Sequence, residues 1–133
     1  MKNVFIRVTE TNDTKQGIVT YSTTDINNIT DKMVQENGLS GVCLFILHGY
    51  NNGERLQEIK PHFHIMLMLE NDIDFQTIKQ YFPYGNIEEI KNTLHTLRYL
   101  THFGYNFKDD FYELSDLVVK QFYKSNIKRV TLF

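Results

Sequence analysis

Residues 60–70, Lys-Pro-His-Phe-His-Ile-Met-Leu-Met-Leu-Glu, place two histidines two positions apart at the start of an apolar run. Alternate residues of a β-strand point to the same side, so His62 and His64 are predicted to share one face of a strand. Met66 and Met68 continue that face, and the opposite face carries Phe63, Ile65, Leu67 and Leu69. One face can then bind a metal ion while the other packs in the core.

The bulk composition predicts one soluble domain over residues 1–133. The chain has 133 residues, of which 41% are hydrophobic and 23% charged, as in ordinary globular proteins. A net charge of −2 argues against a protein that coats nucleic acid by bulk electrostatics, so any nucleic-acid site must be local. Cys43 is the only cysteine, which excludes an internal disulfide. We find no signal peptide or membrane-spanning run, and expect a cytoplasmic protein without a membrane partner.

Hydrophobic periodicity predicts the other elements of the first two thirds of the chain. Alternating apolar residues favour a strand at about 2–9, and a polar stretch follows at 10–17. Helical spacing favours a helix capped by Thr24 or Asp25 and a short second helix capped by Asp74. The remaining predicted elements are helices at about 25–37 and 75–82 and strands at 41–48 and about 61–70.

Residues 86–103 permit two interpretations, a single long helix or a strand at about 86–91 followed by a helix capped by Asn92. We favour the split, because it gives the order βαββαβ followed by a helix, which closes an antiparallel sheet with two helices on one face. The predicted class is therefore α+β. Beyond this segment, helical spacing extends over 111–123, and 127–133 is expected to add an edge strand.

A third histidine is expected beside the pair. His48 ends the strand at 41–48, and a hairpin through residues 49–60 would bring it next to His62 and His64. Neutral imidazoles suit Mn²⁺, Zn²⁺, Co²⁺ or Ni²⁺ better than Mg²⁺ or Ca²⁺, which prefer oxygen ligands. Asn51 or Glu54 could supply an oxygen ligand, although each also fits a solvated loop residue. Without a metal, the histidines would be polar residues near a strand end.

The helix predicted after Asn92 carries a tyrosine, Tyr99, at the edge of its apolar stripe. Helical geometry places Tyr99 in one row with His95 and His102, at the edge of an apolar stripe. That position suits a side chain entering a site between helix and sheet, although it also suits an amphipathic rim residue. The stripe consists of Leu94, Leu97, Leu100 and Phe103.

Three segments together resemble a known family. Pro61-His62-Phe63-His64-Ile65-Met66-Leu67 resembles the His-hydrophobic-His motif of HUH single-strand endonucleases. Arg98-Tyr99-Leu100-Thr101-His102 resembles the tyrosine motif of small rolling-circle replication initiator (Rep) proteins of plasmids and viruses, and Leu47-His48-Gly49-Tyr50-Asn51 lies where those initiators carry a further metal-ligand histidine. The matches keep the family's order over residues 47–102. They depart from it at Gly49 and Asn51, where the family commonly has acidic residues.

The resemblance implies a complete set of functional expectations. The fold would be a ferredoxin-like or RRM-like HUH nuclease domain, with His48, His62 and His64 as metal ligands and Tyr99 as the nucleophile. The cofactor would be a divalent metal, Mn²⁺ before Mg²⁺. Tyr99 would nick and rejoin single-stranded DNA through a 5′-phosphotyrosine and so initiate rolling-circle replication in a bacterial or archaeal host cell. Expected partners are single-stranded or hairpin origin DNA, with a homodimer and host replication proteins left open. Candidate phosphate contacts are Arg7, Lys60, Lys91 and Arg98, and candidate proton-transfer groups are His102 and Lys108.

Three alternatives remain open from the sequence. A single-tyrosine HUH transposase would keep the metal ligands and use Tyr123 as its nucleophile. A non-catalytic RRM-like module would bind nucleic acid through aromatic residues exposed on the two central strands. A metal-dependent hydrolase would use water and form no protein–DNA adduct.

Overall fold

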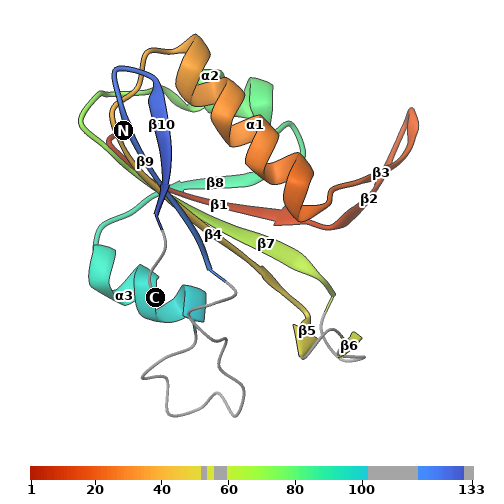
Figure 1. Ribbon diagram of the computed structural model, residues 1–133. Helices are drawn as coiled ribbons and strands as arrows, with labels where there is room; N and C mark the ends of the chain where they lie inside the picture. Colours follow the sequence, from red (N-terminus) through yellow and green to blue (C-terminus); the bar gives the residue numbers. More distant parts are fainter. Residues whose placement is uncertain (52–53, 56–59, 102–116, 131–133) are drawn as a thin grey trace.

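The computed structural model describes residues 1–51, 54–55, 60–101 and 117–130, and these form an α+β structure around one antiparallel sheet (Figure 1). The six strands of the sheet lie in the order β10-β9-β4-β7-β1-β8. Their bounds are Asn3–Thr9 for β1, Gly41–His48 for β4, His62–Leu69 for β7, Asn86–Glu89 for β8, Val118–Tyr123 for β9 and Asn126–Val130 for β10. Two small ribbons pair β2 (Thr11–Thr14) with β3 (Gly17–Thr20) and β5 (Tyr50–Asn51) with β6 (Glu54–Arg55).

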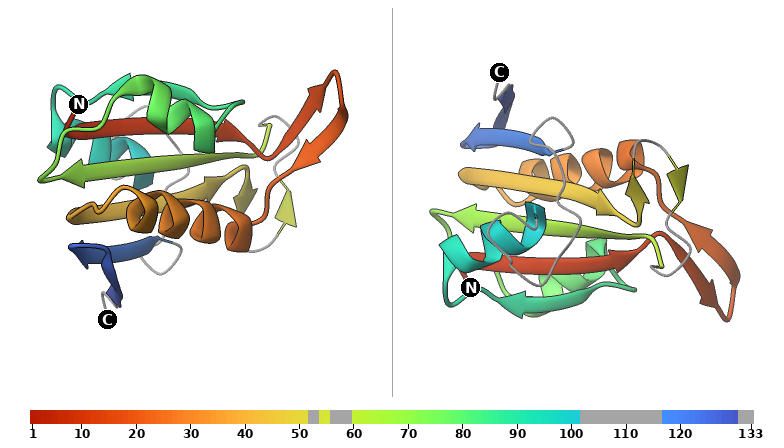
Figure 2. Two further views of the ribbon diagram at one scale, coloured as in Figure 1. Left: turned by 90° about the horizontal axis from the view of Figure 1, so that it is seen from above. Right: turned by 90° about the horizontal axis from the view of Figure 1, so that it is seen from below.

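The three helices of the described residues cover the two faces of the sheet. Helices α1 (Thr23–Glu36) and α2 (Phe75–Tyr81) lie on one face, and α3 (Thr93–Thr101) crosses the other face (Figure 2). The preferred split of residues 86–103 is confirmed, because Asn86–Glu89 is a strand that pairs with β1 and α3 follows it. The expectation of two helices on one face is confirmed as well.

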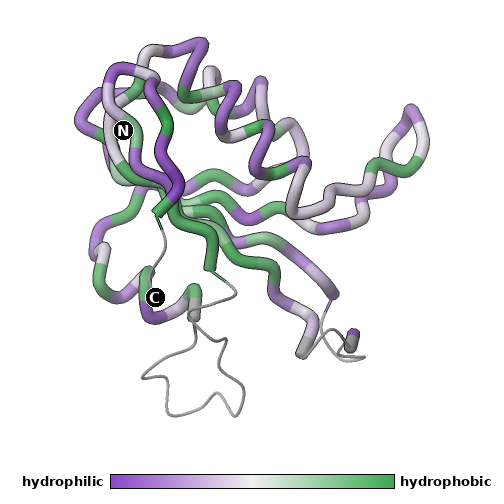
Figure 3. The backbone as a smooth tube through the Cα atoms, viewed as in Figure 1, coloured by the Kyte–Doolittle hydropathy of each residue, from purple (hydrophilic) through white to green (hydrophobic). Residues whose placement is uncertain are grey.

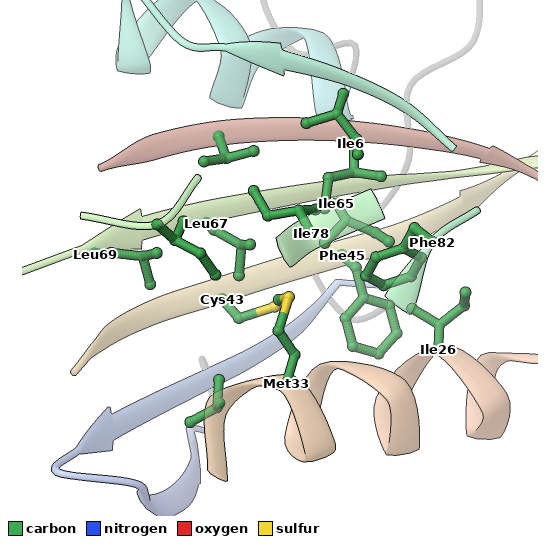
Figure 4. Close-up of a cluster of buried hydrophobic side chains, with 14 of the residues drawn as sticks. Ile6, Ile26, Met33, Cys43, Phe45, Ile65, Leu67, Leu69, Ile78 and Phe82 are labelled. Atoms are coloured by element: carbon green, nitrogen blue, oxygen red, sulfur yellow. The ribbon is translucent and has the colours of Figure 1, made fainter. Parts of the chain in front are cut away.

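Alternating burial along the central strands produces two apolar clusters. The larger lies between the sheet and helices α1 and α2, and contains Phe63 together with Phe45 and Ile65, which Figure 4 labels. The smaller lies on the α3 face and contains Leu44, Met66 and Leu100. Strand β7, placed between β4 and β1, contributes to both clusters, as its predicted two-sided pattern requires. Residue hydropathy follows the same arrangement, because apolar residues are concentrated in the strands of the sheet (Figure 3).

Helix starts follow the chemistry of their capping residues. Asp74 Oδ1 accepts the Thr77 N–H at 2.7 Å, and Asn92 Oδ1 accepts the His95 N–H at 2.9 Å, as predicted. Helix α1 begins earlier than predicted, because Ser22 is the N-cap and Asp25 is the N3 residue of a capping box.

The polar stretch 10–17, for which the sequence predicted no helix or strand, contributes to the β2–β3 hairpin, which projects beyond the end of the sheet (Figure 1). One part of the sequence-based interpretation is wrong. Residues 118–123, assigned to a helix by their spacing, form β9, because alternate residues Val118, Lys120 and Phe122 are buried on the α1 side. Residues 102–116, including the start of that proposed helix, lie outside the described part.

The predicted edge strand is confirmed, whereas the predicted apolar stripe of α3 is confirmed only in part. The predicted edge strand is present as β10, Asn126–Val130, while residues 131–133 lie outside the described part. Of the apolar stripe on α3, Leu100 is buried, but Leu94 and Leu97 are exposed. Phe103 lies outside the described residues. The contact of α3 with the sheet is therefore narrower than its sequence predicted.

Among the helices described, α1 is the longest with 14 residues, and none has the length and hydropathy of a bilayer-spanning segment.

Candidate metal centre

The three histidines predicted as ligands lie together at one end of the sheet. Strands β4 and β7 pair antiparallel, and His48 is the direct partner of His62 in their register. His64 follows on the same face of β7. The side chains of His48, His62 and His64 are 2%, 8% and 0% exposed, and one ring nitrogen from each lies within 4.8 Å of the others. Three buried imidazoles are thus close enough to bind one metal ion.

Backbone carbonyls hold two of these rings in defined tautomers. The Nδ1–H group of His62 donates to the Lys60 carbonyl at 2.7 Å, and the Nε2–H group of His48 donates to the Leu100 carbonyl. A carbonyl can only accept, so each bonded nitrogen carries the proton and, in the neutral ring, the other nitrogen keeps its lone pair. Ligating histidines in metalloproteins are commonly oriented by such a bond. The donor set therefore fits a divalent metal with imidazole preference.

Gly49, which directly follows His48, occupies a position that only glycine fits. Its φ of +107° lies in a region that residues with a side chain rarely adopt, and a Cβ atom there would lie 2.7 Å from Pro61 Cα. The close approach of these two residues keeps the ends of β4 and β7 together. An acidic residue at position 49 is therefore excluded by the packing. The side chains of Asn51 and Glu54 lie outside the described part, so their expected ligand role stays a prediction.

Tyr99 lies beside the histidines. Its ring stacks on His64 with a centroid separation of 5.0 Å and an interplanar angle of 22°. Phe5 of β1 packs its ring edge against both, at 5.1 Å from His64 and 6.4 Å from Tyr99. The carbonyl of Leu100, the next residue, binds His48. Helix α3 is thus attached to the histidine cluster through two adjacent residues.

Tyr123, the nucleophile of the transposase alternative, lies elsewhere. It belongs to β9 rather than to a helix, and its neighbour Phe122 pairs with Gly41 at the start of β4. His48 ends β4, seven residues farther along. At about 3.3 Å per residue this separation is about 23 Å. The described structure therefore brings Tyr99, and not Tyr123, to the histidines.

The candidate phosphate contacts differ in their placement. Arg7 is exposed and pairs with His64 across the β1–β7 ladder, so it shares the histidine face. Lys60 is exposed beside His62, and Lys91 lines a groove of about 540 Å³ that also borders Tyr99. Arg98 is an exposed residue of α3. The proton-transfer candidates His102 and Lys108 lie outside the described residues.

Strands β4 and β7 offer no aromatic platform of the kind expected for an RRM-like module, whereas β1, the other neighbour of β7, presents Phe5 on this face against His64 and Tyr99. On the α3 face, the described side chains of β4 and β7 are aliphatic, thioether or imidazole, and Leu100 covers part of them. Sequence reasoning missed the part that Phe5 plays in the site. The period-two pattern of β1 was a usable signal, since it puts Phe5 and Arg7 on one face.

A scan against protein-family models and a search of curated proteins both return no match for this chain. The geometry of the site is consequently the basis for any functional assignment.

Proposed function

We propose that this protein is an HUH-type endonuclease and transesterase that nicks and joins single-stranded DNA and initiates rolling-circle replication. The observation that carries the proposal is the convergence of three buried imidazoles with a tyrosine ring stacked 5.0 Å from one of them. His48, His62 and His64 bind the metal, Mn²⁺ before Mg²⁺, and Tyr99 is the nucleophile.

The topology supports the same assignment. The order β4-β7-β1-β8, with α1 and α2 on one face, is compatible with a ferredoxin-like βαββαβ arrangement, to which β9 and β10 add an edge. Helix α3 follows β8 and lies against the histidine face, where an HUH enzyme needs its nucleophile. Fold alone does not imply function, so the proposal depends on the site and uses topology only as support.

The chemistry follows from the residues present. When bound, a divalent cation neutralises and polarises a non-bridging oxygen of the scissile phosphate. The phenol oxygen of Tyr99 attacks phosphorus and loses its proton to solvent, a phosphorus–oxygen bond to Tyr99 forms, and the bond to the 3′ oxygen breaks. The leaving strand takes up a proton as a free 3′-hydroxyl, while the 5′ phosphate stays on the tyrosine. Because one phosphodiester replaces another, no ATP is needed and the same hydroxyl can reverse the step.

The neighbouring residues favour this role for Tyr99. Stacking on His64 and the edge contact with Phe5 restrict the phenol ring beside the ligand cluster, which limits the orientation entropy lost on attack. The hydrogen bond from His48 to the Leu100 carbonyl fixes the helix that carries the nucleophile relative to a ligand.

The decisive experiment is adduct formation. The protein is incubated with Mn²⁺ and a pool of single-stranded oligonucleotides labelled at the 3′ end, and a denaturing gel reports labelled protein. We expect an adduct with the native chain and with Tyr123→Phe, a matched control at an exposed side chain of β9, and none with Tyr99→Phe.

Two results would overturn parts of the proposal. Loss of the adduct only in Tyr123→Phe would reassign the nucleophile to the transposase alternative. Cleaved product without any covalent adduct would favour hydrolysis by water.

A further inference from the structure

Two pockets flank the histidine centre, and their charges are opposite. The groove beside Tyr99 contains Glu88 and Glu89 but a single cationic side chain, Lys91. A larger pocket of about 820 Å³ lies at the end of the sheet, where β1 leads into β2. Its charged lining consists of Arg55, Lys60, Lys79, Glu10 and Asp13. In a chain of net charge −2, this is a local excess of positive charge.

The larger pocket shares a wall with the metal centre. Pro61 lines the pocket and directly precedes the ligand His62. The Glu10 N–H group donates to the Pro61 carbonyl at 2.9 Å, and His62 donates to the Lys60 carbonyl at 2.7 Å. The pocket and the histidine cluster are therefore held together by one short segment, and a polymer bound at one can reach the other.

The lining residues suit a nucleotide. Tyr50 and Tyr84 both border the pocket, and Tyr84 is 41% exposed, so its ring is accessible to a stacking partner. The hydroxyl of Tyr50 donates to the two Glu10 carboxylate oxygens at 3.0 and 3.2 Å, which fixes that ring and raises the pKa of Tyr50. Nucleobases stack on aromatic rings regardless of sequence, and arginine or lysine binds the adjoining phosphate. The volume lies within the range of pockets that enclose small ligands.

We propose that this pocket binds one nucleotide of the DNA strand next to the scissile phosphate, with its base against the tyrosines and its phosphate toward Arg55 and Lys60. The inference depends on the proposed function, because it takes a single strand at the histidine centre as the substrate. Carboxylates at Glu88 and Glu89 repel a phosphate backbone, so the strand is directed to the cationic side.

Photo-cross-linking tests the assignment without requiring cleavage. A twelve-residue oligothymidylate with one 5-iodouracil, moved through successive positions, is irradiated with the Tyr99→Phe protein in EDTA, and labelled peptides are identified by mass spectrometry. We expect cross-links to Tyr84 or Tyr50. Tyr84→Ala should weaken binding of the oligonucleotide by about 5- to 150-fold, the range that stacking of one base supplies.

Charge reversal supplies the matched control. Arg55→Glu combined with Lys60→Glu should abolish the pocket cross-link. Lys32→Glu combined with Lys128→Glu makes the same change in net charge at exposed residues of α1 and β10 and should leave it intact. All four positions are exposed, and thermal melts verify that the variants fold.

The outcomes separate this inference from the proposed function. Cross-links confined to Phe5 and position 99, at the acidic groove, would overturn the pocket. Equal labelling by 5-iodo-dUMP alone would also overturn it, because that result indicates a free-nucleotide site. A Tyr99 adduct in the native protein without pocket cross-links would refute only the pocket. Pocket cross-links without an adduct under any metal would refute the nicking function and leave the strand-binding pocket supported.

Discussion

Loading the histidine centre with a divalent metal should stabilise the native protein measurably. The three donor nitrogens already lie within 4.8 Å of one another on paired strands, so the native chain presents a site that the unfolded chain lacks. A ligand that binds only the native state at 100 times its Kd adds about 2.7 kcal/mol to the free energy of unfolding. For a domain of this size, about 3–5 °C in Tm accompanies each kcal/mol, so we expect a rise of about 8–14 °C.

His62→Gln should remove this rise. The substitution deletes one ligand nitrogen, while the glutamine amide can still donate to the Lys60 carbonyl that His62 contacts. The fold without metal should therefore be nearly unchanged. His95→Gln is the matched control, because His95 is an exposed histidine of α3 outside the triad.

Circular dichroism melts with Mn²⁺ or Zn²⁺ at concentrations scaled to the Kd from calorimetry provide the measurement, and excess EDTA should reverse the shift. A stoichiometry of one ion per chain is expected. An equal rise in Tm for His62→Gln and His95→Gln would refute a metal site built from the triad. A native protein whose Tm does not change with any of the metals tested would refute it as well.

Three further predictions concern other parts of the molecule. Arg7→Ala should lower the rate of adduct formation about tenfold or more without lowering Tm, because Arg7 pairs with His64 and can donate charged hydrogen bonds to phosphate; Arg129→Ala should have no effect on a gel time course. Lys120 is buried and donates to Asp31 Oδ1 at 2.6 Å, so Asp31→Ala should cost about 3 kcal/mol in urea unfolding, whereas Lys120→Met should cost much less because it leaves no buried charge. Burial raises the pKa of the Cys43 thiol to about 12, so a thiol reagent at pH 8 should label the protein only as fast as it unfolds, and faster labelling would contradict the packing around Cys43.

The histidine strand was predictable because local pattern and tertiary environment agree there. Strand β7 is central, with partners on both sides, and its period-two pattern identifies the core face and the histidine face. The pairing of His48 with His62 also followed from sequence, since a single loop connects their strands. Capping by Asp74 and Asn92 was predictable for a similar reason, because a cap is a contact between residues three positions apart.

The failures occur where tertiary contacts decide the outcome. Residues 118–123 have helical spacing, yet they form a strand. They pair with β4, which lies far earlier in the sequence, and with β10, which follows directly. Lys120 is charged in sequence but buried in the structure, because Asp31 and Thr30 of α1 accept hydrogen bonds from its ammonium group. The stacking of Tyr99 on His64 and the pocket assembled around Tyr50 and Tyr84 depend on segments that no local pattern connects.

The bond between His48 and the Leu100 carbonyl has a consequence for how this site can change over evolutionary time. The acceptor is a main-chain oxygen, so no codon change at position 100 that preserves the helix can delete it. Substitution of the side chain at position 100 therefore leaves the acceptor for His48 in place, and with it the contact between α3 and the histidine cluster.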